Sequence, residues 1–418
     1  MNNRSAAASA KGRSVARRSD LIGQVADWLM SQALEDTDFE TMFGGCCERM
    51  RAAGVPMWRG HISFRILHPM YDSMALTWRY GEGVMIDRFP HTMEDDFPEV
   101  FKVSPLYHLI VADLPFLRRR LTGRQALVDF PVLEELRAAG ATDYYAFLLR
   151  FGSDELDGLV GSWATDRPRG FSDGDIRAMQ RIQRRLGVAC KMRIKDDIAR
   201  SVVTTYLGPE AGLRVLDGQI RRGDGEVIRA VIWYSDLRQS TSMADRLPPD
   251  EYIRALNDYF ECAGGAVLHH GGQIQSFIGD AVLAVFPIRR GTTARQACRR
   301  ALRASTAAER AMAELNGRRR AAGRPTLSFG LALHLGDVLF GNIGVPERIS
   351  FSVIGSTVNE VARLEALTKK LKRTVVASES FVAQSDAAWD DLGRHRVKGV
   401  KAPLHVFGLA SDDAAARR

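Results

Sequence analysis

Two aspartates in the C-terminal half of the chain each follow a segment rich in apolar and β-forming residues. Asp236 ends the run AVIWYSD, and Asp280 lies in SFIGDAVLAVF between two apolar runs, a pattern typical of a hairpin with both arms buried. Two carboxylates at neighbouring strand ends repel each other unless a cation lies between them, and a divalent metal is the usual cation. The alternative is that each aspartate only serves its own turn, as Asp after Gly often does.

The elements around these aspartates alternate between strands and helices from about Val227 onward. A helix opens at Asp250 after two prolines and ends before Gly271, the hairpin follows, and a second helix begins at Thr293. Two strands, LSFGLALHLG and FSVIG, then lead to a helix that begins near Thr357, and the last strands lie in VVAS and RVKGVKAPLHVFGL. This order predicts an α+β domain with a ferredoxin-like βαββαβ core and added strands.

Four motifs that carry chemistry occur in order in this half of the chain. They are SDLRQST at 235–241, GDAVLAVF at 279–286, GSTVNEVAR at 355–363 and KGVK at 398–401. With these motifs, residues 227–410 resemble the catalytic domain of the class III adenylate and guanylate cyclases. The resemblance implies a phosphorus–oxygen lyase in which Asp236, Leu237 and Asp280 hold two Mg²⁺ or Mn²⁺ ions per site.

The reaction of that family is an in-line attack of the ribose 3′-oxygen on the α-phosphorus, with pyrophosphate leaving. Backbone N–H groups of the loop after Asp236 would face the β- and γ-phosphates, and Asn359 would orient the ribose. Arg363 would meet the charge that grows on the α-phosphoryl group. The substrate-binding residues that the resemblance implies are Leu237, Gln239, Ser240, Thr241, Ser276, Ser352 and Lys398.

In the family the two halves of each site come from opposite subunits, so the resemblance also implies a homodimer with two sites. Taken singly, each residue of the second half has an ordinary explanation. Asn359 would be a residue of a helix's first turn, Arg363 a surface charge and Lys398 a turn lysine. Their joint occurrence in the expected order favours the catalytic interpretation.

Base selection is where the sequence departs from the family. The position four residues before the second aspartate is usually Lys in adenylate cyclases and is Ser276 here. The second base position is Ser352, which fits a bacterial subgroup that carries Thr or Ser there. A hydroxyl rotates freely and can donate to adenine or accept from guanine, which weakens discrimination. Strand alternation predicts that Gln275 lies on the opposite face from Ser276.

Three functions therefore stay open. The leading one is an adenylate cyclase that converts ATP to cyclic AMP with a relaxed base pocket. The second is a guanylate cyclase or a cyclase of mixed specificity. The third is a signalling module whose cyclase domain is weak and whose N-terminal region binds the ligand. A diguanylate cyclase is disfavoured, because its GG(D/E)EF hairpin is replaced by FIGDA.

The N-terminal half suggests a sensory α+β domain. We expect a disordered basic tail at 1–20, and at 21–195 helices at both ends of an antiparallel sheet of five or six strands. The hairpin and helix at the end of this region resemble a GAF domain, which implies an unknown small-molecule or protein signal. An inert dimerisation domain is the alternative.

The segment 196–226 is predicted to be a helical linker followed by short connecting strands, and 411–418 a tail. Ile194, Ile198 and Val202 recur at a spacing of four, which favours a contact between two parallel helices of a dimer.

Composition limits the remaining classes of function. The 418 residues are 45% hydrophobic and 26% charged, and no run is long enough for a membrane span, so we expect a cytoplasmic protein. The net charge of +8 is spread along the chain, which gives nucleic-acid binding little support. The five cysteines show no metal spacing and are expected to be reduced thiols. No histidine spacing indicates a metal or haem site.

Overall fold

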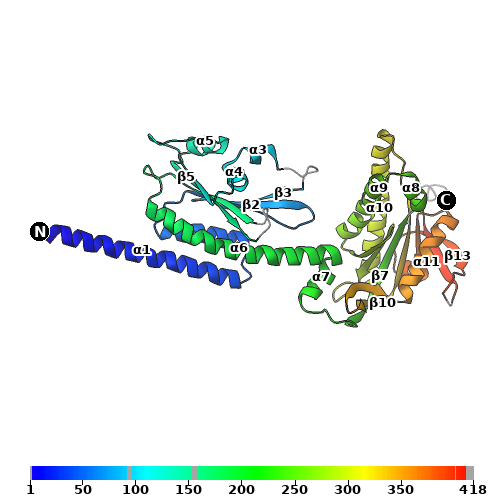
Figure 1. The fold of residues 1–418 in the computed structure, drawn as a ribbon. Coiled ribbons are helices and arrows are strands. Elements are labelled where there is room, and N and C mark those ends of the chain that lie inside the picture. The colour runs from blue at the N-terminus through cyan, green and yellow to red at the C-terminus, as the bar shows by residue number, and fades with distance from the viewer. Residues whose placement is uncertain (1, 92–96, 153–157, 401, 411–418) are drawn as a thin grey trace. The chain divides into compact units, whose positions relative to one another are not determined.

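The computed structural model describes residues 2–91, 97–152, 158–400 and 402–410 (Figure 1). The predicted tail at 411–418 lies outside the described residues. The chain forms two compact units, divided in the sequence between Val202 and Val203. Among the described residues, no helix combines the length and apolar character that a membrane crossing requires.

The N-terminal unit contains a six-stranded antiparallel sheet in the order β3-β2-β1-β6-β5-β4. Residues alternate between its two faces, so Tyr145 and Phe147 belong to one core cluster and Tyr144 and Ala146 to another. The strands are β1 (Arg59–Arg65), β2 (Tyr71–Arg79), β3 (Gly83–Pro90), β4 (Phe116–Arg120), β5 (Asp143–Arg150) and β6 (Gly158–Thr165).

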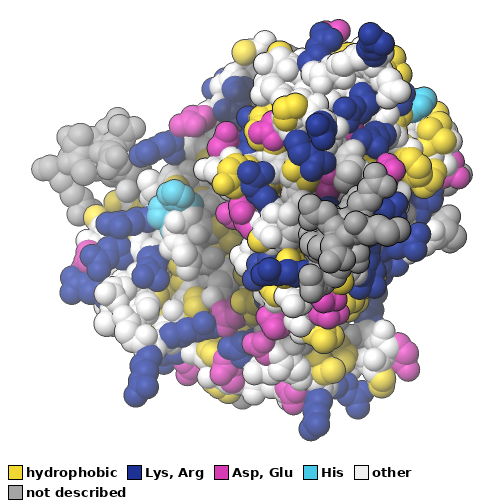
Figure 2. Space-filling view, turned by 90° about the vertical axis from the view of Figure 1, so that its left-hand side faces the viewer, with side chains coloured by type: hydrophobic (Ala, Val, Ile, Leu, Met, Phe, Trp, Pro, Cys, Tyr) yellow, Lys and Arg dark blue, Asp and Glu magenta, His cyan; other side chains and the backbone are white. Residues whose placement is uncertain are grey.

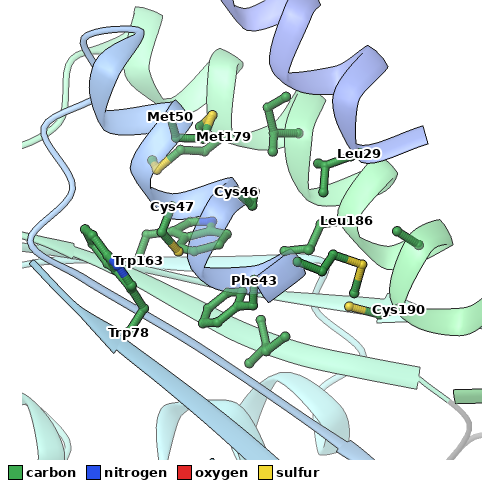
Figure 3. Close-up of a cluster of buried hydrophobic side chains, with 14 of the residues drawn as sticks. Leu29, Phe43, Cys46, Cys47, Met50, Trp78, Trp163, Met179, Leu186 and Cys190 are labelled. Atoms are coloured by element: carbon green, nitrogen blue, oxygen red, sulfur yellow. The ribbon is translucent and has the colours of Figure 1, made fainter. Parts of the chain in front are cut away.

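Three helices cover one face of this sheet and three short ones the other (Figure 1). Figure 3 shows the first face, where side chains of α1, α2 and α6 surround Trp163 together with the buried thiols of Cys46 and Cys190. The long-helix face is made by α1 (Asn2–Leu34), α2 (Phe39–Ala52) and α6 (Asp173–Leu207), and the other by α3 (Glu99–Lys102), α4 (Pro105–Val111) and α5 (Pro131–Ala138).

Residues 2–20 are helical in the structure, whereas the sequence predicts a disordered tail there. Alanine, arginine and lysine are good helix formers, so the basic composition of this segment is compatible with the first part of α1. Near the end of this segment, the guanidinium of Arg18 pairs with the buried carboxylate of Asp175 and donates to the carbonyl of Gly54. These contacts hold this part of α1 against the rest of the N-terminal unit.

The first part of the linker is helical as predicted, and its second part differs. Helix α6 runs without a break through the start of the linker, and Ile194 and Ile198 pack against the core of the N-terminal unit. After Gly208, which has a positive φ, a short helix α7 (Pro209–Leu216) occupies the place where short strands were expected. Proline at the first helical position and Gly before it explain this restart.

The C-terminal unit contains an eight-stranded sheet in the order β13-β14-β12-β10-β7-β9-β8, with β11 paired to β10. The chain order β7-α9-β8-β9-α10-β10 with β10-β7-β9-β8 in space is the βαββαβ arrangement that the sequence predicts. Its strands are β7 (Gly225–Leu237), β8 (Gln273–Ile278), β9 (Ala281–Pro287), β10 (Phe329–Val345), β11 (Arg348–Ile354), β12 (Val375–Ser378), β13 (Trp389–His395) and β14 (Leu404–Leu409).

Helices cover both faces of this sheet. Along β7, Val231 and Trp233 face a core shared with α9 and α10, while Ile232 faces a second core shared with α11 and with Ala211 of α7. The helices are α8 (Ser240–Arg246), α9 (Pro249–His269), α10 (Ala294–Ala321), α11 (Ser356–Leu371) and α12 (Glu379–Val382). These two faces are called the α9 face and the α11 face below.

Figure 2 shows how charged side chains are distributed on one face of the molecule. On the face drawn in Figure 2, Lys and Arg side chains are spread among acidic, apolar and other groups instead of forming one stripe. A stripe of basic side chains is the usual electrostatic sign of nucleic-acid binding.

Candidate active site

Strand alternation places Asp236 on the α11 face at the end of β7. The residue before it, Ser235, faces the other way, because its Oγ lies 2.7 Å from the Oη of Tyr259 on α9. Asp236 pairs in register with Ala281 of β9 on one side and with Gly330 of β10 on the other. Asp236 therefore lies on a central strand of the sheet, at the end of that strand next to the turn of the β8–β9 hairpin.

The β8–β9 hairpin brings Asp280 to Asp236. Gly279 turns the chain with a φ of +62°, and the carbonyl of Asp280 accepts a hydrogen bond of 3.2 Å from the N–H of Leu237. Burial raises the pKa of Asp236 to about 7, and the charges of Asp280 and Glu365 and a hydrogen bond to Asp280 add to this effect. The two aspartates that the sequence singled out are thus in contact.

This pair fits a divalent cation. Its donors are hard carboxylate oxygens, and a bound cation would offset both the burial of the charge on Asp236 and its repulsion by Asp280. Within the described ranges, no group of three His, Cys, Asp or Glu side chains is arranged to hold a metal by itself. Further ligands would have to come from backbone carbonyl groups, water or substrate phosphates, as is common for Mg²⁺.

A third carboxylate lies beside the pair and was not predicted. Glu365 of α11 is buried, and its Oε1 accepts a hydrogen bond of 3.1 Å from Thr368. It lies directly over Gly330, the register partner of Asp236, so that a Cβ at Gly330 would collide with it. Burial raises the pKa of Glu365 as well. The sequence feature that could have identified Glu365 is the presence of a carboxylate among the apolar residues that α11 turns toward the sheet.

The loop after Asp236 offers fewer free N–H groups than the sequence suggested. Leu237 donates to Asp280 as described, and the N–H of Arg238 donates to the carbonyl of Ser328 at 2.8 Å. Gln239 adopts a left-handed conformation with a φ of +62° and precedes the first turn of α8. The predicted binding of the β- and γ-phosphates therefore rests on the N–H groups of Gln239, Ser240 and Thr241.

Asn359 and Arg363 lie on the outer face of α11. Both are exposed, and they are one turn apart, so their side chains point in nearly the same direction. Glu365 is two residues beyond Arg363, about 200° around the helix, and points down to the sheet. The chain therefore brings Asp236 and Asp280 together but turns Asn359 and Arg363 away from them.

The remaining predicted residues lie at the edges of the unit. Lys398 is exposed in the turn between β13 and β14. Ser276 on β8 and Ser352 on β11 are both half-buried, and β11 contacts β8, so the two serines lie on neighbouring elements. This placement is compatible with a pocket to which both strands contribute.

Comparison with known families identifies the C-terminal unit. Residues 226–411 match the family model described as the adenylate and guanylate cyclase catalytic domain. An adenylate cyclase from Anabaena cylindrica is 36% identical over 167 residues, which are 39% of this chain and 32% of that protein. Adenylate cyclase 1 from Rhizobium meliloti is 31% identical over 178 residues, which are 42% of this chain and 26% of that protein. The chain thus spans a third or less of the length of these relatives.

Solved structures with cyclase domains are also similar. The crystal structure of an adenylyl cyclase from P. aeruginosa covers 45% of this chain and 97% of its own, with 23% identity and a TM-score of 0.41. That of a guanylyl cyclase covers 45% of this chain and 94% of its own, with 29% identity and a TM-score of 0.40.

Proposed function

Residues 226–411 are a class III nucleotidyl cyclase catalytic domain, and we propose that through it the chain converts ATP to 3′,5′-cyclic AMP and pyrophosphate. The observation that carries the proposal is the contact between Asp236 and Asp280, where burial, with the charge of Asp280 adding to its effect, raises the pKa of Asp236 to about 7. Such a pair is suited to hold cations against a triphosphate. The two adenylate cyclases that match this region support ATP as the substrate.

Each residue of the site has a role in this proposal. Asp236, Asp280 and the carbonyl of Leu237 would hold two Mg²⁺ or Mn²⁺ ions, which when bound neutralise phosphate charge and favour loss of the ribose 3′-proton. The N–H groups of the α8 loop would bind the β- and γ-phosphates. Asn359 would orient the ribose, Arg363 would stabilise the charge on the α-phosphoryl group, and Lys398 would pair with the triphosphate.

We propose that the site forms between two copies of the chain. Asn359 and Arg363 are exposed and directed away from the aspartates of their own chain, so a second copy must supply them. Exposed apolar side chains, among them Phe277, Ile278, Val345 and Ile349, are carried by the β8–β9 hairpin and the β10–β11 arm, which suits a contact between copies. A homodimer would hold two such sites.

We further propose that the N-terminal unit is a GAF-like sensory domain that regulates the cyclase in response to a small molecule or a protein. Its six-stranded antiparallel sheet, with helices on both faces, supports this interpretation. An ATP-consuming reaction fits a cytoplasmic enzyme, and that location belongs to the same proposal.

A second candidate is a guanylate cyclase or one of mixed specificity. The observation that favours it is Ser276, a short neutral residue in a position that is usually Lys in adenylate cyclases. A serine hydroxyl donates or accepts with equal ease, so it does not exclude guanine.

The test uses the full chain with Mn²⁺ or Mg²⁺ and either ATP or GTP, with products identified by mass spectrometry. Cyclic AMP as the main product supports the proposal, and cyclic GMP as the main product supports the second candidate. Loss of product in Asp236→Asn, with an unchanged circular dichroism spectrum, would attribute the activity to this site. A folded dimer that makes neither product would refute both.

A further inference from the structure

Strand β8 contains one residue more than its partner requires. Its pairing with β9 runs through Ile274 opposite Ala284 and resumes with Ser276 opposite Leu283. Ala284 and Leu283 are consecutive, so Gln275 has no partner and the strand forms a β-bulge at this point. Bulges of this kind often lie beside active sites, where they redirect a side chain.

The side chains on either side of the bulge show its effect. Ile274 packs on α9, where its Cδ1 lies 2.9 Å from the position of a Cβ on Gly264. The ring of Phe277 also packs on α9, with its centroid 4.5 Å from that of Phe260. On a regular strand, residues three apart face opposite sides of the sheet. Both contacts on the α9 face are possible only because the bulge takes up one residue.

The two residues between Ile274 and Phe277 therefore both lie on the α11 face. Gln275 and Ser276 both project on that side, and the expectation that strand alternation separates them is wrong. Both are half-buried, and β11 with Ser352 lies next to this strand. The bulge thus adds an amide side chain to the place where the base pocket is expected.

The amide of Gln275 is unengaged, unlike that of its neighbour on the same face. Gln273 donates to Oε2 of Glu210 on α7 at 2.5 Å, and this hydrogen bond holds its amide against α7. Among the described residues, the side chain of Gln275 has no hydrogen-bond partner. It is free to meet a ligand.

We infer that Gln275 is a specificity-determining residue that binds the Watson–Crick edge of the purine, an inference that rests on the proposed cyclase function. Its carbonyl oxygen can accept from the adenine amino group while its NH₂ donates to adenine N1. After a half-turn of the amide, the same atoms accept from guanine N1–H and donate to guanine O6. Gln275 thus supplies a base contact that Ser276 is too short to make, and it admits both purines.

The test is Gln275→Glu, which keeps the shape of the side chain and removes its donor. A carboxylate still accepts from guanine N1–H but faces the lone pair of adenine N1, so kcat/KM for GTP relative to ATP should rise by about tenfold or more. Gln384→Glu is the matched control, since it makes the same charge change at an exposed residue after α12, and it should leave the ratio unchanged. Gln275→Met, which has no amide, should weaken the use of both nucleotides without changing their ratio.

The preference for GTP over ATP is also measured in equilibrium binding, as the ratio of the affinities for the non-cyclisable α,β-methylene analogues of the two nucleotides. A GTP-to-ATP ratio that stays within twofold in Gln275→Glu, in kinetics and in binding, would overturn the role of Gln275 while leaving the cyclase intact. Wild-type protein that makes no cyclic nucleotide and binds neither analogue would overturn the proposed function itself, and this inference with it.

Discussion

Asp236 carries its proton to an unusually high pH for a carboxyl group. In the protein without metal its pKa is about 7, compared with an ordinary value of 3.8, so the folded state binds more protons than the unfolded state between these values. The contribution of Asp236 to stability is therefore present below about pH 4 and is lost as the pH rises through 7. We predict that Asp236→Asn raises the unfolding temperature of the metal-free protein at pH 8 and has little effect at pH 4.

The control for this prediction is Asp245→Asn, which changes an exposed aspartate on α8 and should not alter the pH dependence. Mn²⁺ should raise the unfolding temperature of the wild-type protein at pH 8 but not that of Asp236→Asn, because the variant lacks the charged ligand. If the wild-type protein and Asp236→Asn lost the same amount of stability between pH 4 and pH 8, this result would contradict the raised pKa of Asp236.

Arg363 tests the second half of the site. Because its side chain is exposed on α11, Arg363→Ala should leave the fold intact. Loss of its charge at the transition state should lower kcat by about 10²–10³-fold, on the order of 2–4 kcal/mol, with a smaller change in KM. Steady-state kinetics measure both constants. Lys369→Ala, an exposed cation on the same helix, is the matched control and should retain activity.

The residues of the proposed site could be named from the sequence because they stand in short motifs. Asp236 and Asp280 are recognisable since each lies where a strand meets a turn, and the structure brings them into contact. Glu365 could not be assigned in the same way. Its relation to Asp236 depends on how α11 lies over Gly330, and that packing is set by contacts between segments far apart in the sequence.

At the scale of elements, strand β8 shows where sequence patterns stop being sufficient. QIQSFI can be read as a regular strand, and the bulge is revealed only by the pairing of β8 with β9 and by the packing of Phe277 on Phe260 of α9. Helix α7 was missed for a related reason, because its eight residues are too few to show a clear helical period. The larger elements were predicted correctly where apolar spacing persisted over many residues.

A buried aspartate joins three elements of the N-terminal unit. Asp143 of β5 accepts from Arg118 of β4 at 2.7 Å, from Arg120 at 3.1 Å and from the N–H of Phe171, just before α6, at 2.8 Å. Asp143→Ala removes the carboxylate that these donors share and leaves Arg118 and Arg120 only their backbone carbonyl partners, Phe171 and Arg169. We predict that it lowers the free energy of unfolding of this unit by about 3 kcal/mol. Hydrogen exchange of peptides from β4 and β5 measures the change.

Asp72→Ala is the control, since the pair of Asp72 with Arg65 is largely exposed and should contribute little, about 0–1 kcal/mol. Equal effects of the two substitutions on hydrogen exchange would show that burial does not strengthen the Asp143 network.

At the scale of the whole molecule, the shared site predicts complementation. Asp236→Ala and Arg363→Ala chains should each be inactive alone. A heterodimer of the two keeps one intact site, made from the aspartates of one chain and the arginine of the other. With random pairing of equal amounts, about a quarter of the wild-type activity should return.

Co-expression of the two variants with different affinity tags measures this effect in the unfractionated mixture. The doubly purified dimer contains only heterodimers and should show about half of the wild-type activity. Mixing Asp236→Ala with Asp280→Ala chains is the control, since both lesions affect the same half of the site and no heterodimer is intact. Activity below one per cent of wild type in the first mixture, with heterodimers present, would contradict a shared site.

The division of the chain into two units, the second with a cyclase domain, was accessible from the sequence, but the structure of the segments between and before them was only partly so. Arg18 pairs with Asp175 across more than a hundred residues of sequence, a contact that no local composition could reveal. Similarly, Ile194 and Ile198, whose spacing favours a contact between two helices, pack against the core of their own unit. Spacing alone does not say which surface an apolar stripe will cover.

The unpaired residue in β8 also bears on how such a pocket changes during evolution. A substitution on a regular strand exchanges one side chain for another, whereas an inserted residue that forms a bulge adds a side chain to one face and leaves the other face undisturbed. Loss of the codon for Gln275 would return β8 to regular alternation, with Ile274 and Phe277 still packed on α9. With the role proposed for Gln275, insertion or deletion of this single residue would change substrate choice while Ile274 and Phe277 keep their packing on α9.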